Sequence, residues 1–310
     1  MGLGLGISVD WASLVPYYAR VASAFKARVE ADGGTVESMS CLKADLKVLT
    51  GKLAPDLLLN DYDGAAAAYS LRLLDKSYSG NAIKVRRASD NAEQDIAFSN
   101  NELDTATLET FASGTDAFVT TWYDQSGNAN NATQATASSQ PKIVSSGSTI
   151  LESGKPSIDF ASNKSLFESS VSLTQPFTRF SVRRYTNESV SNDVFLQQNS
   201  GSFSNLLDIG FSARKSHFGS YLSGDSETFT NNISYLLANG ASSETKENNS
   251  TLYTGNTGTN GLSGLRIGLS PLTSFFRSNV KGQEIIIWNN DQSSNRTGIE
   301  TNINDFYSIY

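Results

Sequence analysis

The hydrophobic pattern of the chain changes after about fifty residues. Within residues 11–49, apolar side chains recur at steps of three and four, which is the period of an amphipathic helix. Gly33-Gly34 ends the first helix, and Thr35 can cap a second one. The pattern therefore predicts a helical hairpin, whose apolar faces include Trp11, Leu14, Tyr18, Val21, Phe25, Met39, Leu42 and Leu46.

Two short helices cannot bury both apolar faces by themselves. The faces can pack on the rest of the same chain, or they can dock on another copy or another protein, since near-heptad spacing is compatible with both. We interpret residues 1–50 as an anchoring or oligomerisation segment, with the eight residues named above as its assembly interface. Residues 51–64, which include Gly51 and Pro55, are expected to be a linker.

Residues 65–310 show a different pattern, in which short apolar runs alternate with turns rich in Ser, Gly and Asn. Ala65–Leu74 is expected to be a helix, and Asp104 is expected to cap a short helix that ends at Phe111. Ser294 is expected to cap a last helix, from Asn295 to about Tyr307. Spacing of this kind predicts a two-sheet antiparallel sandwich. Its expected strands are Ile83–Arg87, Asp95–Phe98, Phe118–Tyr123, Ser157–Phe160, Phe177–Arg183, Asp193–Gln197, Leu206–Phe211, Ser234–Leu237, Leu265–Leu269 and Gly282–Trp288.

The charge and residue composition of the chain exclude several classes of binding partner and metal site. A formal net charge of −7 argues against nucleic acid and anionic membranes as partners. No apolar run approaches the length of a membrane span, so no membrane insertion is expected. Cys41 is the only cysteine and His217 the only histidine, which excludes an internal disulfide and a Cys/His zinc site. We expect no cofactor and no bound metal; oxygen ligands for calcium are plentiful, but no EF-hand loop is present.

Three short strings carry a family resemblance. They are Val119–Asn128 (Val-Thr-Thr-Trp-Tyr-Asp-Gln-Ser-Gly-Asn), Ala68–Arg72 and Val85–Arg87. Together they resemble the catalytic-domain family of α-L-arabinofuranosidases, whose module also recurs in bacteriophage virion proteins. The end of the chain resembles the closing strand and terminal helix of laminin-G-like modules. The resemblance implies a mainly β fold, namely a concanavalin-like antiparallel β-sandwich (jelly roll), here with an N-terminal helical hairpin and a short C-terminal helix.

The resembled family cleaves arabinofuranosyl groups with two carboxylates. One of its acids precedes the final strand, where this chain has Ile267–Pro271 and no carboxylate. The other belongs to an earlier loop, for which Leu206–Gly210 offers Asp208 without matching neighbours. Neither acid carries over residue by residue, and we do not assign catalysis to Glu284. The sequence therefore predicts no enzyme activity and no catalytic residues.

The turn that follows the strand at Phe118–Tyr123 supplies the candidate ligand residues. An aromatic side chain beside carboxylate and amide groups can hold a sugar by stacking and hydrogen bonding. On this basis Tyr123, Asp124, Gln125 and Asn128 are predicted to bind a ligand. The alternative interpretation is structural: the same residues form a network of turn hydrogen bonds and ion pairs that fixes the ends of the strands.

These observations favour a bacteriophage virion structural protein: a decoration, fibre or tail-associated adhesin with a non-catalytic glycan-binding sandwich. Its expected partners are other virion proteins, copies of itself and a host-surface glycan, and its expected location is the virion. One alternative is an active arabinofuranosidase-like glycoside hydrolase that acts on surface polysaccharide. Another is a purely architectural virion subunit without a ligand.

Overall fold

The computed structural model of the protein describes residues 57–161, 164–186, 193–199, 206–210, 214–224, 229–268 and 279–310. The chain divides into two compact units, Met1–Asp56 and Leu57–Tyr310, and only the second is described below. The predicted helical hairpin and its eight interface residues lie outside the described residues.

The second unit is mainly β, as predicted, with few helices. In chain order, its elements are α3 (Leu58–Asp61), β1 (Ala65–Ser70), β2 (Ile83–Arg87), β3 (Glu93–Ile96), β4 (Phe98–Ser99), β5 (Glu102–Leu103), α4 (Thr105–Ala112), β6 (Ala117–Trp122), β7 (Ala132–Thr133), β8 (Lys142–Ser145), β9 (Ser148–Thr149), β10 (Leu151–Glu152), β11 (Lys155–Pro156), β12 (Ile158–Asp159), β13 (Ser165–Leu173), β14 (Phe177–Tyr185), β15 (Asp193–Gln198), β16 (Leu206–Gly210), β17 (Arg214–His217), β18 (Tyr221–Ser223), β19 (Asn232–Ala238), β20 (Ser243–Glu247), β21 (Tyr253–Gly255), β22 (Leu262–Gly268), β23 (Val280–Trp288) and α5 (Arg296–Tyr307).

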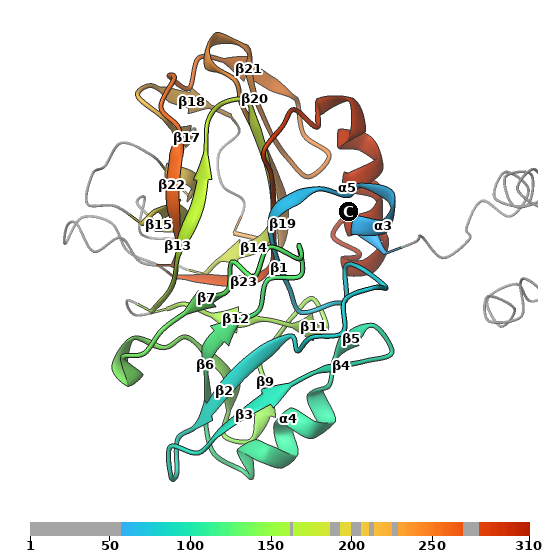
Figure 1. Ribbon diagram of the computed structural model, residues 1–310, viewed down its shortest axis with the longest axis vertical. Coiled ribbons are helices and arrows are strands. Elements are labelled where there is room, and N and C mark those ends of the chain that lie inside the picture. The colour runs from blue at the N-terminus through green and yellow to red at the C-terminus, as the bar shows by residue number, and fades with distance from the viewer. Residues whose placement is uncertain are drawn as a thin grey trace, which may run out of the picture. The chain divides into compact units, whose positions relative to one another are not determined.

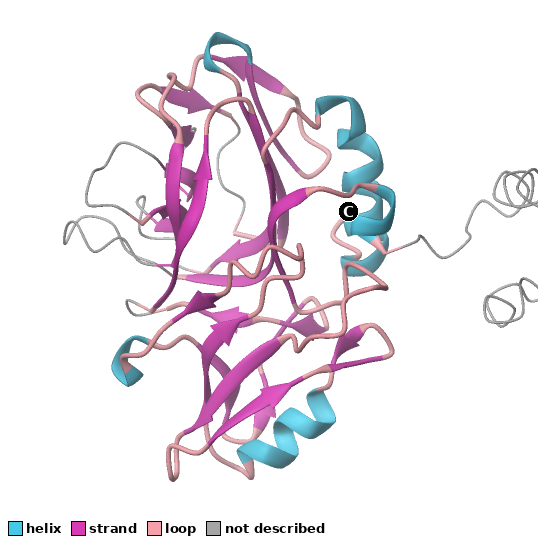
Figure 2. Cartoon of the chain, in the orientation of Figure 1, coloured by secondary structure: helices cyan, strands magenta, loops and turns pink. Residues whose placement is uncertain are grey.

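The strands form a β-sandwich-like fold (Figure 1). In one layer, β23 lies between β1 and β14, and β14 continues through β19 to β20 and β21. In the other layer, β13 pairs with β22, which continues through β15, β16 and β17 to β18. All of these pairings are antiparallel. Helices are few and lie outside the sheets (Figure 2).

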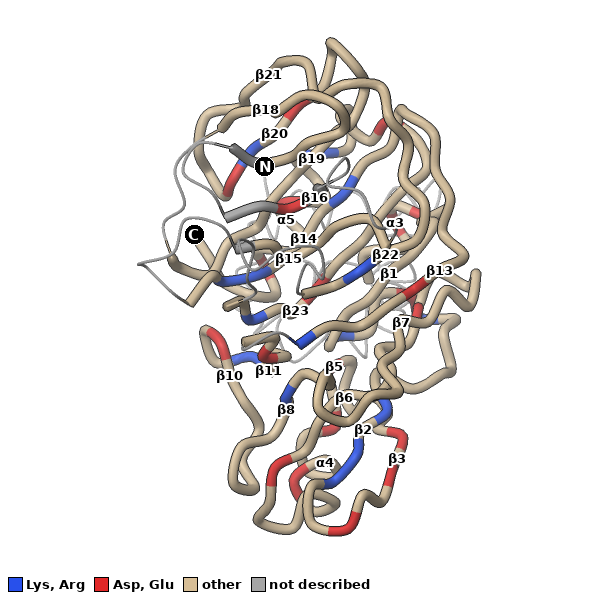
Figure 3. Tube along the Cα trace, turned by 90° about the vertical axis from the view of Figure 1, so that its left-hand side faces the viewer, with Lys and Arg blue, Asp and Glu red and all other residues tan. Residues whose placement is uncertain are grey.

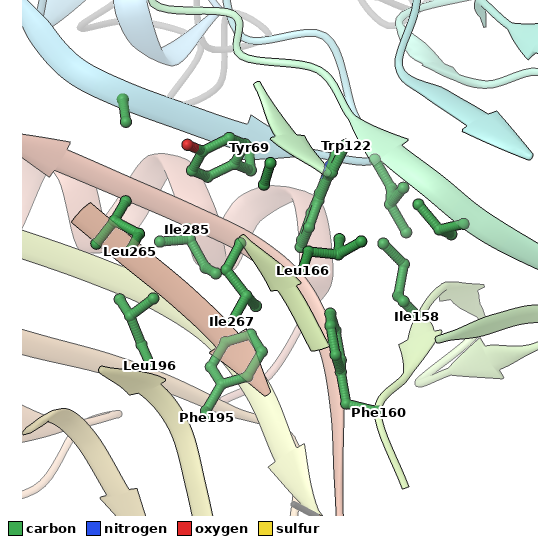
Figure 4. Packing of buried hydrophobic residues seen from close by; sticks show 14 of the residues in the cluster. Tyr69, Trp122, Ile158, Phe160, Leu166, Phe195, Leu196, Leu265, Ile267 and Ile285 are labelled. Carbon is green, nitrogen blue, oxygen red and sulfur yellow. The ribbon is translucent and has the colours of Figure 1, made fainter. Parts of the chain in front are cut away.

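The main hydrophobic core lies between the strand layers. Figure 4 shows Trp122, Leu166, Ile267 and Phe195 pointing toward one another from β6, β13, β22 and β15, and each is fully buried. A second core lies between β14, β23 and the helices α3 and α5, and it contains Phe180, Trp288 and Ile303 together with other buried residues. Because strand side chains alternate between faces, β14 and β23 each contribute to both cores.

The prediction of a helix at Ala65–Leu74 is wrong. Ala65–Ser70 forms β1, which pairs along its length with β23. Four consecutive alanines favour a helix locally, but here the segment is almost fully buried on both faces. Small side chains fit at this position beside Trp288 and the isoleucines of β23, so tertiary packing overrides the intrinsic propensity.

The predicted N-cap residues of the helices α4 and α5 have different outcomes: one is confirmed and the other is wrong. Asp104 caps α4 as predicted, since its Oδ1 accepts a hydrogen bond from the Thr107 N–H at 3.0 Å. The terminal helix α5 is present, but its N-cap is Asn295, which makes no side-chain capping bond. Ser294 instead lies in the short 3₁₀ turn that precedes the helix, so its prediction as the cap is wrong. In addition, α3 falls inside the segment expected to be a linker, and its Leu58 and Leu59 are buried.

Candidate active site

A cluster of charged side chains is buried between β14 and β16. Asp208 on β16 has a side chain only 1% exposed. Arg183 donates to its Oδ1 from Nε at 3.1 Å and from Nη2 at 3.0 Å. Arg179 donates to its Oδ2 from Nη1 at 3.2 Å. Charged positions thus occur in the middle of the sheets as well as in the loops (Figure 3).

The alternation of β14 explains why these arginines point inward. Arg179, Ser181 and Arg183 share one face of the strand, whereas Phe180 and Val182 face the second core under α5. Ser181 donates from its hydroxyl to Asp208, and so does the hydroxyl of Tyr185 at 3.3 Å. Each buried charge therefore has hydrogen-bond partners, which burial of a charge requires.

The surroundings of Asp208 keep its carboxyl group ionised. Burial alone raises the pKa of Asp208, but the charges of Arg183 and Arg179, with the hydrogen bond from Ser181, outweigh burial and lower the pKa to about 2. For Arg179, burial is the larger effect and lowers its pKa, against the charges of Asp208 and Glu247. Asp208 is therefore a carboxylate throughout the neutral and mildly acidic range.

Glu247 on β20 joins the same cluster. The Nη2 atom of Arg183 that contacts Asp208 also donates to Glu247 Oε1 at 3.0 Å. Two oxygens that share one nitrogen at these distances are at most about 6 Å apart, a limit that allows the separation of about 5–5.5 Å typical of retaining glycosidases. The Glu247 side chain is 10% exposed, so it lies on the more open side of the cluster.

A second buried carboxylate, Glu284 on β23, has a different environment. Arg72 holds it with two parallel hydrogen bonds, Nε to Oε2 at 2.8 Å and Nη2 to Oε1 at 3.0 Å. Ser70 donates to it at 2.7 Å, and the Tyr307 hydroxyl of α5 lies at 3.3 Å. Arg72 also donates to Asn302 of α5 at 3.0 Å. These contacts fasten α5 to the sheet.

Asp124 and Gln125, two of the predicted ligand residues, are buried. Asp124 accepts hydrogen bonds from the Ala68 N–H at 2.8 Å, from the Asn130 N–H at 2.9 Å, and from the N–H and hydroxyl of Ser126. Gln125 accepts from the Leu74 N–H and donates to the carbonyls of Ser70, at the end of β1, and of Arg72. Their polar atoms tie the turn to β1 and its continuation.

Tyr123 and Asn128 are less enclosed. The Tyr123 hydroxyl donates to Asp95 Oδ1 at 2.6 Å, and burial together with this bond raises the pKa of Tyr123. Asn128 donates from Nδ2 to the carbonyl of Ala65 at 2.9 Å. The structure thus brings all four residues to one turn, and ligand binding by them stays a prediction.

The described residues give no other catalytic arrangement. His217 packs against Tyr221, with ring centroids 4.5 Å apart. Within the described ranges, no group of three or more His, Cys, Asp or Glu side chains is placed to hold a metal ion. None of the helices there is both long and apolar enough to cross a membrane.

One sequence signal for this cluster lies in β14. Phe177–Tyr185 is a long strand in which Arg179, Ser181 and Arg183 occupy alternate positions between apolar residues. Charged residues on the core-facing side of a central strand require a buried counter-charge. Asp208 lies in the segment that corresponds to a loop with a family acid, but its arginine partners lie 25 and 29 residues away in the chain.

Comparison with known proteins identifies the fold. Residues 60–165 match the family described as "Alpha-L-arabinofuranosidase B, catalytic". The probable α-L-arabinofuranosidase B of Aspergillus fumigatus is 42% identical over 72 residues, which make up 23% of this chain and 14% of that protein.

Two solved structures resemble the chain over most of its length. One is an arabinofuranosidase complexed with arabinofuranosyl-α-1,2-xylobiose, with a TM-score of 0.58. The other is a GH54 α-L-arabinofuranosidase soaked with a cyclic sulfate inhibitor, with a TM-score of 0.59. Each is 14% identical, and the match covers 80% of this chain and 64% of that one. The chain thus spans less than two thirds of the length of the relatives it matches, and the structural likeness shows a shared fold.

These matches overturn the prediction of a non-catalytic virion structural protein. The resemblance to the arabinofuranosidase B catalytic domain is confirmed, but the matched proteins are enzymes and give no link to phage particles. The prediction failed because it required two acids inside recognisable strings. The neighbours of a carboxylate in space do not appear in such strings, and those of Asp208 come from β14.

Proposed function

We propose that the unit Leu57–Tyr310 is a glycoside hydrolase that removes α-L-arabinofuranosyl groups with retention of configuration. The arrangement of Asp208, Arg183 and Glu247 carries this proposal: it joins an ionised carboxylate to a second one through a shared guanidinium. The matched family and the arabinofuranosidase fold support the choice of substrate class. Retaining hydrolysis needs two carboxyl groups and no cofactor, which agrees with the residues present.

In this proposal Asp208 is the nucleophile. Its low pKa keeps it anionic, and the Arg183 and Arg179 guanidinium groups fix its two oxygens. Attack on the anomeric carbon forms a glycosyl ester as the glycosidic bond breaks. Because the side chain is 1% exposed, the cluster must open on the Glu247 side to admit the sugar.

Glu247 is the proposed acid/base. As an acid it gives a proton to the departing oxygen, and as a base it takes a proton from the water that cleaves the ester. Its side chain is 10% exposed, against 1% for Asp208, so of the two carboxyl groups it is the nearer to solvent. Arg183 is a positioning residue that sets the separation of the two carboxyl groups.

Kinetics on 4-nitrophenyl α-L-arabinofuranoside test these roles. We expect Asp208→Asn to lower kcat at least about a thousandfold, since an amide cannot form the glycosyl ester. We expect Glu247→Gln to retain more activity on this substrate than on arabinan, because 4-nitrophenolate leaves with little help from an acid. Azide should restore turnover to Asp208→Ala and give a glycosyl azide of inverted configuration.

Glu152→Gln is the matched control. Glu152 has a side chain 10% exposed and is also paired with two cations, Arg184 at 3.2 Å and Lys281 at 3.4 Å, outside the cluster. This variant should keep wild-type kcat. Full activity in folded Asp208→Asn, or an absence of activity in the wild-type chain on every α-L-arabinofuranoside tested, would contradict the proposal.

A further inference from the structure

The sheet that contains β2, β6, β7, β13 and β22 carries a continuous row of side chains on its outward face. Lys84, Thr121, Thr133, Phe167 and Arg266 are successive register partners across these five strands. Register partners in antiparallel strands share a face of the sheet. The neighbouring row points inward and is fully buried in the main core; it consists of Ile83, Trp122, Ala132, Leu166 and Ile267.

This outward row forms a long and partly exposed track. Adjacent strands lie about 4.8 Å apart, so the row from β2 to β22 spans on the order of 20 Å. Figure 1 shows β2 and β6 at one end, β7 between, and β13 and β22 at the other end. Thr133 is exposed and the other four residues are half-buried. The track is therefore long enough to contact several sugar units of an extended chain.

Arg266 is the unusual member of the row. Its guanidinium carbon lies over the Phe167 ring, 4.2 Å from the ring centroid, within the range of a cation–π contact. In the part of the chain that the structure describes, no carboxylate pairs with it, and its buried Nε has no hydrogen-bond acceptor. Burial lowers the pKa of Arg266 to about 10. The side chain is thus a partly desolvated cation, in contact with an aromatic ring, in a protein of net charge −7.

Arg87 provides a comparison, because it also contacts an aromatic ring but in addition pairs with a carboxylate. Its guanidinium carbon lies 4.9 Å from the Phe111 ring centroid, and it also forms an ion pair with Asp90 at 2.6 Å. Arg266 has the aromatic contact without the acid. An anion would complement the Arg266 guanidinium, whose planar fork matches the geometry of a carboxylate.

We propose that the outward row binds an acidic polysaccharide, with a uronic-acid carboxylate paired to Arg266 and neighbouring sugar hydroxyls bonded to Thr121 and Thr133. This site goes beyond the proposed hydrolysis, since it lies on the face of β22 opposite to Leu265 and Ile267. Charge complementarity selects the acidic ligand. The hydroxyl groups along the same track supply contacts that a neutral stretch of the polysaccharide would use.

Titration of the full chain with polygalacturonate and with neutral linear arabinan tests the proposal. We expect binding to polygalacturonate that weakens as NaCl is raised, because exposed charges are screened by salt. Arg266→Gln should weaken this binding at least about tenfold, which is the effect of losing one charge-assisted hydrogen-bonded pair. The affinity of Arg266→Lys for polygalacturonate should lie between those of the wild type and Arg266→Gln. Lysine keeps the charge but lacks the planar guanidinium group that pairs with a carboxylate and stacks on the Phe167 ring.

Three controls separate this site from other causes. Arg87→Gln removes the same charge at a similar aromatic contact and should leave affinity unchanged. Asp208→Asn should bind polygalacturonate like the wild type, and Arg266→Gln should hydrolyse 4-nitrophenyl α-L-arabinofuranoside like the wild type. Equal affinity for the neutral and acidic polymers, wild-type affinity in Arg266→Gln, or loss of binding in Arg87→Gln or Asp208→Asn would overturn the proposal.

Discussion

Asp124 shows how one side chain can organise a turn. It accepts four hydrogen bonds, two of which come from backbone groups more than five residues away, at Ala68 and Asn130. Gly127 in the same turn has φ of +86°, a conformation that side chains with a Cβ rarely adopt. Within the string Val119–Asn128, the hydrogen bonds of Asp124 and the backbone conformation of Gly127 thus account for these two residues by their structural roles.

Asp124→Asn should destabilise the fold without altering the proposed catalytic cluster. An amide in place of the carboxylate turns one acceptor into a donor that faces N–H and hydroxyl donors. We expect a loss of about 2 kcal/mol in the free energy of unfolding, measured by urea denaturation. Asp90→Asn, at an exposed carboxylate, should have a much smaller effect. An unchanged free energy in Asp124→Asn would favour a ligand role over the structural one.

Residue-scale prediction from sequence succeeded where the interaction is local. The Asp104 cap spans three residues, so its partner could be read from the neighbouring sequence. The surroundings of Asp208 could not be read this way, because Arg179, Arg183 and Glu247 come from two other strands. Their distances depend on the register between strands, which no single string encodes.

At the scale of elements, α5 is attached to the sheet by both apolar and ionic contacts. Ile299 and Ile303 pack in the second core, while Arg72 connects Glu284 of β23 with Asn302 of the helix. The ring of Phe306 lies 5.0 Å from the Arg72 guanidinium carbon. The apolar face of α5 was predictable from its period, but this polar attachment was not.

The variant Arg72→Met measures how much the Arg72–Glu284 ion pair contributes to stability. The substitution leaves the Glu284 carboxylate buried without its cation, and we expect a loss of about 3–5 kcal/mol in the free energy of unfolding. The double variant Arg72→Met/Glu284→Met should recover most of this loss, because no buried charge remains. Chemical denaturation of both variants provides the measurement. A double variant no more stable than the single one would argue against the ion pair as the cause.

Element prediction was least reliable where packing and propensity disagree. The alanines of β1 favour a helix, but their neighbours on β23 require small side chains in an extended strand. The strand at Phe118–Tyr123 was predicted within one residue at each end, since its β-branched and aromatic residues agree with its buried environment.

At the scale of the whole molecule, the described unit begins at α3 and ends beyond α5. Leu58 is fully buried, and the Leu59 N–H donates to the Leu74 carbonyl at 2.8 Å. The Trp288 indole N–H donates to the carbonyls of Tyr62 and Asp63. The segment before β1 is therefore part of the second core.

Two truncated chains test where the folding unit begins. A chain that starts at Leu57 should unfold cooperatively and keep the proposed hydrolytic activity. A chain that starts at Ala65 loses two buried leucines, and we expect it to be less stable by about 3–6 kcal/mol. Thermal and urea unfolding of both chains measure the difference. Equal stability of the two chains would place α3 outside the folding unit.

The pairing of β1 with β23 affects the order of events during protein synthesis. Ser70 and Glu284 are hydrogen-bonded although they are 214 residues apart, and β23 is the strand that separates β1 from β14. The strand on which the centre of this layer depends therefore leaves the ribosome long after β1 and β14. Contacts of such long range also slow folding. The growing chain must hold β1 and β14 without their shared neighbour until β23 has been synthesised, a period in which their unpaired edges are available to chaperones and to aggregation.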